Sequence, residues 1–166
     1  MKVNIALLTV TDTRTFDNDK SGAILVDKIK KANHNLLDRK ICKDNKDEIV
    51  LILKEWLKVE KIDVIITTGG TGLTGRDITP EALEEISDKD IPGFGEVFRN
   101  ISLKTVGTSA IQSRACAILS NGKYVFALPG SSGGVTDAWE GILKHQLDIN
   151  HKPCNFVELF PRLKEK

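Results

Sequence analysis

Two loops built from glycine and hydroxyl residues are the parts of this sequence best suited to chemistry. The first covers residues 69–77 (GGTGLTGRD) and the second covers residues 128–134 (LPGSSGG). Each follows an apolar segment that predicts a strand, and open α/β sheets bind ligands at the carboxyl ends of their strands. Glycines let the backbone approach a ligand closely, and successive backbone N–H groups favour an anion. The loops therefore predict an anion site, with a pair of ordinary strand-to-helix turns as the alternative.

Three aspartates stand near these loops or after neighbouring strands. Asp12 follows the first predicted strand, Asp44 follows the second, and Asp77 ends the first glycine loop. Carboxylates beside phosphates usually hold Mg²⁺, which takes one or two carboxylates plus substrate oxygens. The alternative for each acid alone is a helix cap or a solvated loop position. Arg76 and Arg114 are candidates to clamp a phosphate or a carboxylate.

Several familiar site patterns are absent or stand in the wrong context. Residues 70–75 match GxGxxG, but a dinucleotide site needs its helix to follow directly and a second strand ending in an acid about 20 residues later. Here Thr79 and Pro80 predict a later helix start with Thr79 as its N-cap, and residues 87–93 predict no strand. The Walker A pattern is missing. No Ser-His-Asp arrangement or metal-spaced cysteine and histidine set stands out. A Rossmann-type dehydrogenase is therefore set aside.

The elements that would position these loops alternate between strand and helix. Apolar runs predict strands at residues 3–10, 36–42 and 62–67, and helical periodicity predicts helices around residues 24–32 and 47–59. A further helix is expected at residues 91–103. Asn121-Gly122 between two apolar runs predicts a hairpin of strands 115–119 and 124–128. We therefore expect an α/β fold, a three-layer α-β-α domain with a mostly parallel, mixed central sheet.

Composition limits the classes of protein that need consideration. The chain has 166 residues, 40% of them hydrophobic, with 24 Lys+Arg and 23 Asp+Glu for a net charge of +1. This favours one globular domain over residues 1–166, with 147–166 as a C-terminal tail, and argues against a nucleic-acid binder or a membrane protein. No signal peptide is evident, and the three cysteines fit no disulfide framework, so we expect a cytoplasmic protein.

The motifs, taken in order, resemble those of a known family. They are TTGGTG at residues 67–72, RDITPEA at 76–82, PGFGE at 92–96, Ser113-Arg114 and LPGS at 128–131. In this order and spacing they are similar to the molybdopterin adenylyltransferase family of molybdenum cofactor biosynthesis, and most of all to its protein B branch. The resemblance extends from Val3 to about Leu147.

The resemblance implies an activity and a set of residues. The expected reaction moves AMP from ATP to the terminal phosphate of molybdopterin and releases pyrophosphate, with Mg²⁺ required. Family members assemble as trimers or hexamers. Asp44 and Asp77 match the catalytic, metal-binding acids. The residues that match the substrate-binding loops are Thr11, Asp12, Gly69, Gly70, Thr71, Gly72, Ser113, Arg114, Pro129, Gly130, Ser131 and Ser132.

Two other functions stay open at this point. Many active family members carry a proline or lysine after the LPG triplet, where this chain has Ser132-Gly133-Gly134. That departure favours a non-catalytic oligomer that binds a pterin or a nucleotide. An anion-binding module of a larger molybdate-handling protein is a weaker alternative. The apolar tail residues Phe156, Val157, Leu159 and Phe160 are expected to pack on the domain or on a neighbouring subunit.

Overall fold

The computed structural model describes residues 1–165 and forms one mixed sheet. The strand order is β2-β1-β3-β6-β5-β4. β2, β1, β3 and β6 are parallel, while β5 is antiparallel to both β6 and β4. The strands are β1 (Asn4–Val10), β2 (Asn35–Cys42), β3 (Val64–Thr68), β4 (Lys89–Asp90), β5 (Cys116–Ser120) and β6 (Lys123–Leu128). The predicted mixed, mostly parallel sheet is confirmed.

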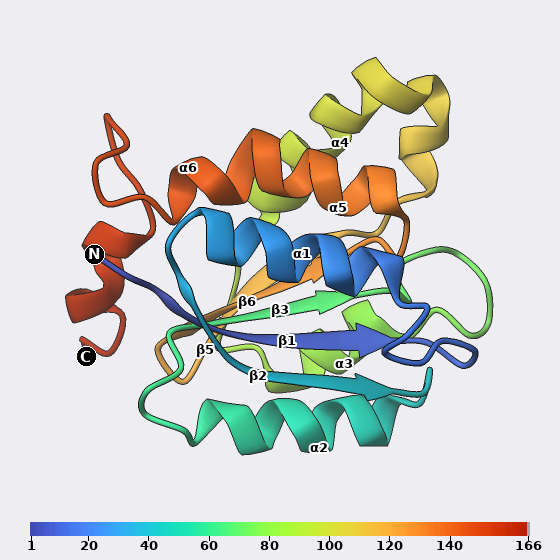
Figure 1. The fold of residues 1–166 in the computed structure, drawn as a ribbon, viewed down its shortest axis with the longest axis horizontal. Helices are drawn as coiled ribbons and strands as arrows, with labels where there is room; N and C mark the ends of the chain where they lie inside the picture. The colour runs from blue at the N-terminus through green and yellow to red at the C-terminus, as the bar shows by residue number, and fades with distance from the viewer. Residues whose placement is uncertain (166) are drawn as a thin grey trace.

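Helices cover both faces of this sheet. On one face lie α1 (Lys20–Lys31), α4 (Pro92–Val106), α5 (Ser132–Ala138) and α6 (Lys144–Gln146), and on the other lie α2 (Lys46–Leu57) and α3 (Thr79–Ile86) (Figure 1). A π-helical turn at Trp139–Leu143 joins α5 to α6, and 3₁₀ turns cover Gly107–Gln112 and Val157–Arg162. The three-layer prediction is therefore confirmed. Within residues 1–165, no helix is long and apolar enough to cross a membrane.

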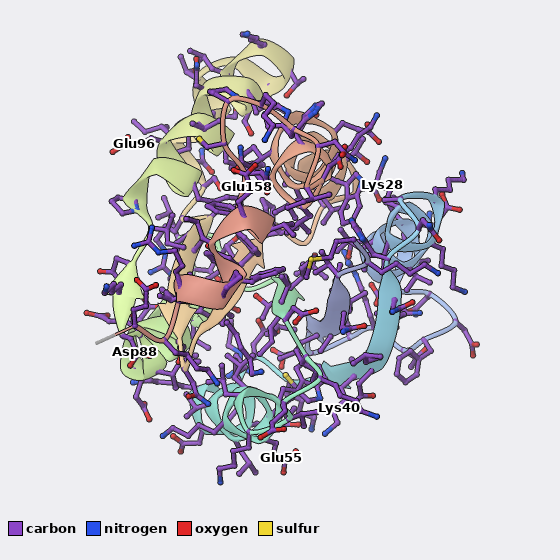
Figure 2. The ribbon with its side chains drawn as sticks, turned by 90° about the vertical axis from the view of Figure 1, so that its left-hand side faces the viewer. Lys28, Lys40, Glu55, Asp88, Glu96 and Glu158 are labelled. Atoms are coloured by element: carbon purple, nitrogen blue, oxygen red, sulfur yellow. The ribbon has the colours of Figure 1, made fainter. Side chains whose placement is uncertain are left out.

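Burial on both faces explains the continuous apolar sequence of β1. Ile5 and Leu7 point into the core beneath α1 and α5, whereas Ala6 and Leu8 point into the core beneath α2 and α3. Successive strand residues face opposite sides, so a strand covered on both sides needs apolar residues throughout. Seen from the end of the sheet, α2 lies along one side, where Glu55 pairs with Lys40 of β2 at 3.1 Å (Figure 2).

Two local predictions around α3 are wrong. Residues 87–93 contain a short strand, β4, because Lys89 and Asp90 pair with the exposed edge of β5. Thr79 is the first residue of α3 rather than its N-cap, and the cap position, Ile78, makes no side-chain cap bond. The Thr79 hydroxyl instead donates to the carbonyl oxygen of Gly69 at 2.8 Å. A two-residue antiparallel edge strand still does not supply the parallel strand of a dinucleotide fold.

The other local predictions concern the hairpin and the tail. Asn121 and Gly122 both adopt positive φ between β5 and β6, which confirms the hairpin turn. Phe156, Val157 and Phe160 pack on the α1-side core, where the ring centroids of Phe156 and Tyr124 lie 4.6 Å apart. Leu159, also expected to pack, is 44% exposed. The tail thus packs largely on its own domain.

Candidate functional site

A cleft opens at the carboxyl ends of β1, β3 and β6. Its volume is about 860 Å³, within the usual range for small-molecule sites. The loops after the three strands form its floor, and α4 with the following 3₁₀ turn forms one wall. The predicted residues that line it are Thr11, Asp44, Gly69, Gly70, Thr71, Gly72, Asp77, Ser113, Pro129, Gly130 and Ser131. Asp12, Arg114 and Ser132 lie outside this lining.

The first glycine loop is pressed against the end of β1. Gly69 has φ +105°, and a Cβ there would lie 2.1 Å from the carbonyl oxygen of Val10. Gly70 also has positive φ, at +66°. The Thr79 backbone N–H donates to the Gly70 carbonyl oxygen at 3.0 Å, which ties the loop to the start of α3. Only glycine fits this path, because of its close approach to the end of β1. The close approach of this backbone to a ligand stays a prediction.

The two predicted catalytic acids both touch this loop. A Cβ at Gly70 would lie 3.2 Å from Asp44 Oδ1, and one at Gly72 would lie 2.8 Å from Asp77 Oδ2. Asp77 Oδ2 accepts hydrogen bonds from the backbone N–H and the hydroxyl of Thr74, at 2.8 and 2.7 Å. Burial raises the pKa of Asp77, but the hydrogen bonds from Thr74 and from the backbone of Gly72 outweigh it, so the net shift is downward. Asp77 is therefore ionised at neutral pH.

The pKa of Asp44 is shifted in the opposite direction, upward. Burial raises the pKa of its carboxyl, and repulsion from Asp12 and Asp77 adds to the rise against the attraction of Arg76. A cation bound beside Asp44 would relieve this repulsion. Within residues 1–165, no three acidic, histidine or cysteine side chains gather closely enough to hold a metal ion by themselves. A metal held here would need oxygen ligands from a substrate, as Mg²⁺ commonly has.

The predicted arginines are engaged by the protein itself. Arg76 donates from Nε and Nη2 to the two carboxylate oxygens of Asp12 at 2.9 and 2.8 Å, and this contact lowers the pKa of Asp12. Arg114 donates to the carbonyl oxygens of Gly72 and Asp77 at 2.7 and 2.8 Å and pairs with the Glu81 carboxylate. Arg114 thus holds the glycine loop in place, and a direct contact with a substrate stays a prediction for both arginines.

The second loop is fixed from two directions. The Thr68 hydroxyl donates to the Pro129 carbonyl oxygen at 2.8 Å, so the end of β3 holds the loop that follows β6. Ser131 is the N-cap of α5, and its hydroxyl oxygen accepts from the Gly134 N–H at 3.1 Å. Ser132 is exposed and is not among the residues that line the cleft, although Ser131 and Gly133 on either side of it are.

The sequence comparisons decide the family. Residues 6–149 match the family described as "Probable molybdopterin binding domain". The chain belongs to this family. Molybdenum cofactor biosynthesis protein B of Escherichia coli strain K12 is 43% identical to the chain over 161 residues, covering 97% of the chain and 93% of that protein. The protein of the same name from Staphylococcus aureus strain MRSA252 is 46% identical over 149 residues, covering 88% of both.

Solved structures agree with this assignment. A crystal structure of a molybdenum cofactor biosynthesis protein B has a TM-score of 0.89 and 38% identity, covering 100% of this chain and 98% of that one. The tungsten cofactor synthesizing protein MoaB from Pyrococcus furiosus has a TM-score of 0.76 and 36% identity, covering 84% and 89%. Family membership supports a role for the chain in molybdenum cofactor biosynthesis.

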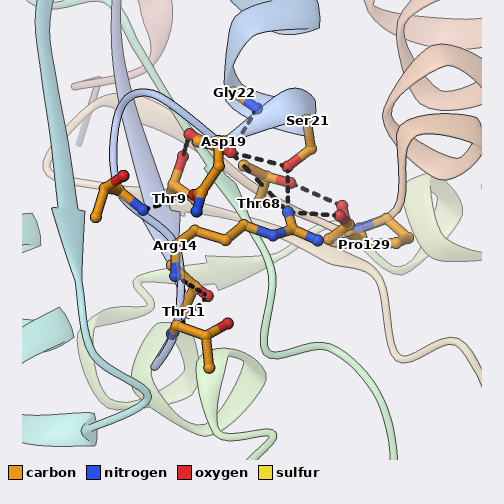
Figure 3. Close-up of polar contacts among 12 residues, drawn as sticks. Thr9, Thr11, Arg14, Asp19, Ser21, Gly22, Thr68 and Pro129 are labelled. Carbon is orange, nitrogen blue, oxygen red and sulfur yellow. Dashed lines mark hydrogen bonds and ion pairs between the residues drawn. The ribbon is translucent and has the colours of Figure 1, made fainter.

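Some residues that line this cleft escaped the sequence analysis. Arg14 lies in the loop after β1 and donates from Nη1 to the carbonyl oxygen of Gly130 at 3.0 Å (Figure 3). Arg14 stands three residues after Thr11, in a loop that the sequence analysis already placed at the site, and this proximity was the signal available for it. Asp137 of α5 accepts from the Thr105 hydroxyl of α4 at 2.8 Å, also at the cleft. No local spacing connects these two residues, because only the packing of α4 on α5 brings them together.

Proposed function

We propose that this protein transfers AMP from ATP to the terminal phosphate of molybdopterin and releases pyrophosphate. The main support is that Asp44 and Asp77 lie against one glycine loop in a single cleft. Their pKa values are shifted in opposite directions, upward for Asp44 and downward for Asp77. The loop's glycines admit a phosphate close to the backbone, and the carboxylates supply ligands for a divalent cation.

The charge of the cleft favours Mg²⁺ as a partner of the substrates. Three carboxylates line it, from Asp44, Asp77 and Asp137, against the single arginine, Arg14, in the part of the chain that the structure describes. ATP and a pterin phosphate add further negative charge. We propose that Asp44 and Asp77 hold Mg²⁺ together with phosphate oxygens. When bound, the ion would neutralise charge that develops on the phosphates during transfer.

The protein's own groups would act by positioning. The backbone N–H groups of Gly70 and Thr71 would hold a phosphate, while Arg114 and Thr79 keep the loop from moving. Positioning and charge stabilisation supply most of the catalysis of phosphoryl and nucleotidyl transfer, so no covalent nucleophile on the protein is required. The Asp77 carboxylate stays ionised because Thr74 donates to it twice.

Turnover by purified protein tests this proposal. Molybdopterin, ATP and Mg²⁺ are mixed with the wild type, and pyrophosphate and adenylated pterin are measured. Asp44→Asn and Asp77→Asn should each lower kcat by about 10²–10³-fold, the usual cost of losing one transition-state contact. Asp47→Asn is the matched control, since Asp47 is exposed and lies outside the cleft. Wild-type protein without pterin-dependent pyrophosphate release, or Asp77→Asn with normal turnover, contradicts the proposal.

A non-catalytic pterin- or nucleotide-binding protein is the second candidate. The observation that favours it is the second loop, where Gly133 and Gly134 bring no side chain to the cleft they line. In the same assay this function predicts binding of ATP or molybdopterin without formation of adenylated pterin.

We also propose that the chain assembles with copies of itself, as trimers or hexamers, and works in the cytoplasm. Apolar side chains are exposed together on α4 and the 3₁₀ turn after it: Ile111 is 82% exposed, and Leu103 and Val106 are more than half exposed. Such side chains are costly to leave in water. Light scattering should give a mass of three or six chains, and Ile111→Lys should lower it; a wild-type monomer contradicts self-assembly.

The proposed location in the cytoplasm is supported by the three free cysteines, because a reducing compartment keeps thiols free.

A further inference from the structure

Arg14 crosses from the loop after β1 to the loop after β6. Its Nη1 donates to the Gly130 carbonyl oxygen and to the Ser21 hydroxyl, both at 3.0 Å. Its side chain is 37% exposed and lines the cleft. Figure 3 shows the side chain extended toward the second loop beside Pro129.

A buried carboxylate holds Arg14 from behind. The side chain of Asp19 has no exposed surface, and its Oδ1 lies 4.0 Å from Arg14 Nη1. Asp19 accepts from the Thr9 hydroxyl at 2.6 Å, from the Gly22 N–H at 3.0 Å and from Arg39 Nη2 at 2.9 Å (Figure 3). The loop after β1, the start of α1 and β2 thus fix one nitrogen of the Arg14 guanidinium before any ligand arrives.

The rest of the guanidinium is open to a ligand. Within residues 1–165, the Arg14 side chain donates its hydrogen bonds from Nη1. Nε and Nη2 therefore remain as donors for a ligand. These two nitrogens form one edge of a planar fork that matches two oxygens of a phosphate. Arg14 is also the single cation among the described residues that line the cleft.

We propose that Arg14 is the phosphate-binding residue of this cleft, and that its Nε and Nη2 donate to a phosphate group lying against Gly130. The ligand class is a phosphate ester or a pyrophosphate. This inference extends the proposed function by naming the residue that recognises phosphate. It rests on the proposed function only for the identity of the natural ligand, since the same contact serves an enzyme or a binding protein.

Calorimetric titration of the whole protein with inorganic pyrophosphate and Mg²⁺ tests the contact. Arg14→Gln should raise the Kd by about ten- to a hundredfold, as expected for losing a charge-assisted, two-point hydrogen bond. Arg14→Lys keeps the charge without the planar fork, so its Kd should lie between those of the wild type and Arg14→Gln. Arg162→Gln is the matched control, because the Arg162 side chain is exposed, pairs with Glu165 and lies outside the cleft. Its Kd should stay within about twofold of the wild type, since surface pairs away from the ligand contribute little.

The possible outcomes separate this inference from the proposed function. Wild-type protein that does not bind pyrophosphate, an unchanged Kd in folded Arg14→Gln and Arg14→Lys, or an equal loss in Arg162→Gln overturns the role of Arg14. If Arg14→Gln weakens pyrophosphate binding while the wild type makes no adenylated pterin, the phosphate contact stands and the adenylyltransferase proposal fails. Parallel titrations with ATP and with molybdopterin identify the source of the phosphate, because only the ligand that Arg14 touches loses affinity.

Discussion

Removing the Asp19 carboxylate is the sharpest test of how the fold supports the cleft. In Asp19→Ala, α1 loses its N-cap, the Thr9 hydroxyl loses its acceptor, and Arg39 loses its ion-pair partner. We expect the variant to fold with much lower stability. The phosphate affinity should also fall, since Arg14 loses the charge that lies behind it.

The size of the effect follows from these contacts. Loss of an N-cap costs about 1 kcal/mol. A buried hydroxyl and a guanidinium left without partners cost about 1–3 kcal/mol each, so the sum with the cap is about 3–7 kcal/mol, similar to the cost of other broken buried pairs. For a chain of this length, 1 kcal/mol shifts the melting temperature by roughly 2–4 °C, so the expected drop is on the order of 10 °C.

Urea unfolding and thermal melting at pH 7 measure the loss. Asp17→Ala is the matched control, because Asp17 is exposed in the same loop. Burial raises the pKa of Asp19, but hydrogen bonds from Thr9, Gly22 and Arg39 outweigh it and the net shift is downward. A lowered pKa gives stability that is complete above the ordinary value of 3.8 and is lost as pH falls through the folded value. The wild-type advantage should therefore shrink only in strong acid. A loss below about 1 kcal/mol, equal to that of Asp17→Ala, would refute the reasoning.

Two further predictions address the glycine loop and the thiols. Gly69→Ala should destabilise the protein by about 1–3 kcal/mol or more, because of its positive φ and the 2.1 Å approach of a Cβ to the Val10 carbonyl oxygen. Gly75→Ala, where a Cβ meets nothing within 4 Å, should be nearly neutral in the same urea titration; equal losses would show that the loop can adapt. An aromatic disulfide reagent should modify exposed Cys154 in the native protein, whereas Cys42, whose pKa burial raises to about 12, should react only on unfolding. Rapid modification of Cys42 in native protein would contradict its burial.

The sequence predicted the features that local patterns control. The apolar run of β1, the Asn121-Gly122 turn and the glycine loop each depend on neighbouring residues, and the structure contains all of them. β4 could not be predicted, because two polar residues become a strand only by pairing with β5. The Thr79 hydroxyl was predicted as a cap, but the carbonyl oxygen of Gly69, ten residues earlier, is its partner.

The arginines show the same difference between features set by neighbouring residues and features set by distant partners. Arg76 and Arg114 stand beside the motifs, so both were natural candidates to hold a phosphate. The carbonyl oxygens that engage Arg114 belong to residues 42 and 37 positions away, and the Arg76 partner is 64 positions away. Arg14 reaches the cleft through a partner 116 positions away. Charge and motif position pointed to Arg76 and Arg114, but only the folded loops determine that Arg14 lines the cleft.

Under the proposed function, the charge balance of the cleft would join Mg²⁺, the phosphate and Arg14 in one equilibrium. Asp44 is destabilised in its ionised form by burial and by two neighbouring carboxylates, so a cation is favoured there. A phosphate is repelled by the same carboxylates and attracted by Arg14. The cation therefore raises the affinity for phosphate, and thermodynamic linkage requires phosphate to raise the affinity for the cation by the same factor. Under the proposed function, protonation of Asp44 would remove a ligand of the cation and leave the Arg14 contact in place. The cleft would then have two separable phosphate contacts: one would depend on Mg²⁺ and weaken as Asp44 is protonated, and the other would depend on the Arg14 guanidinium.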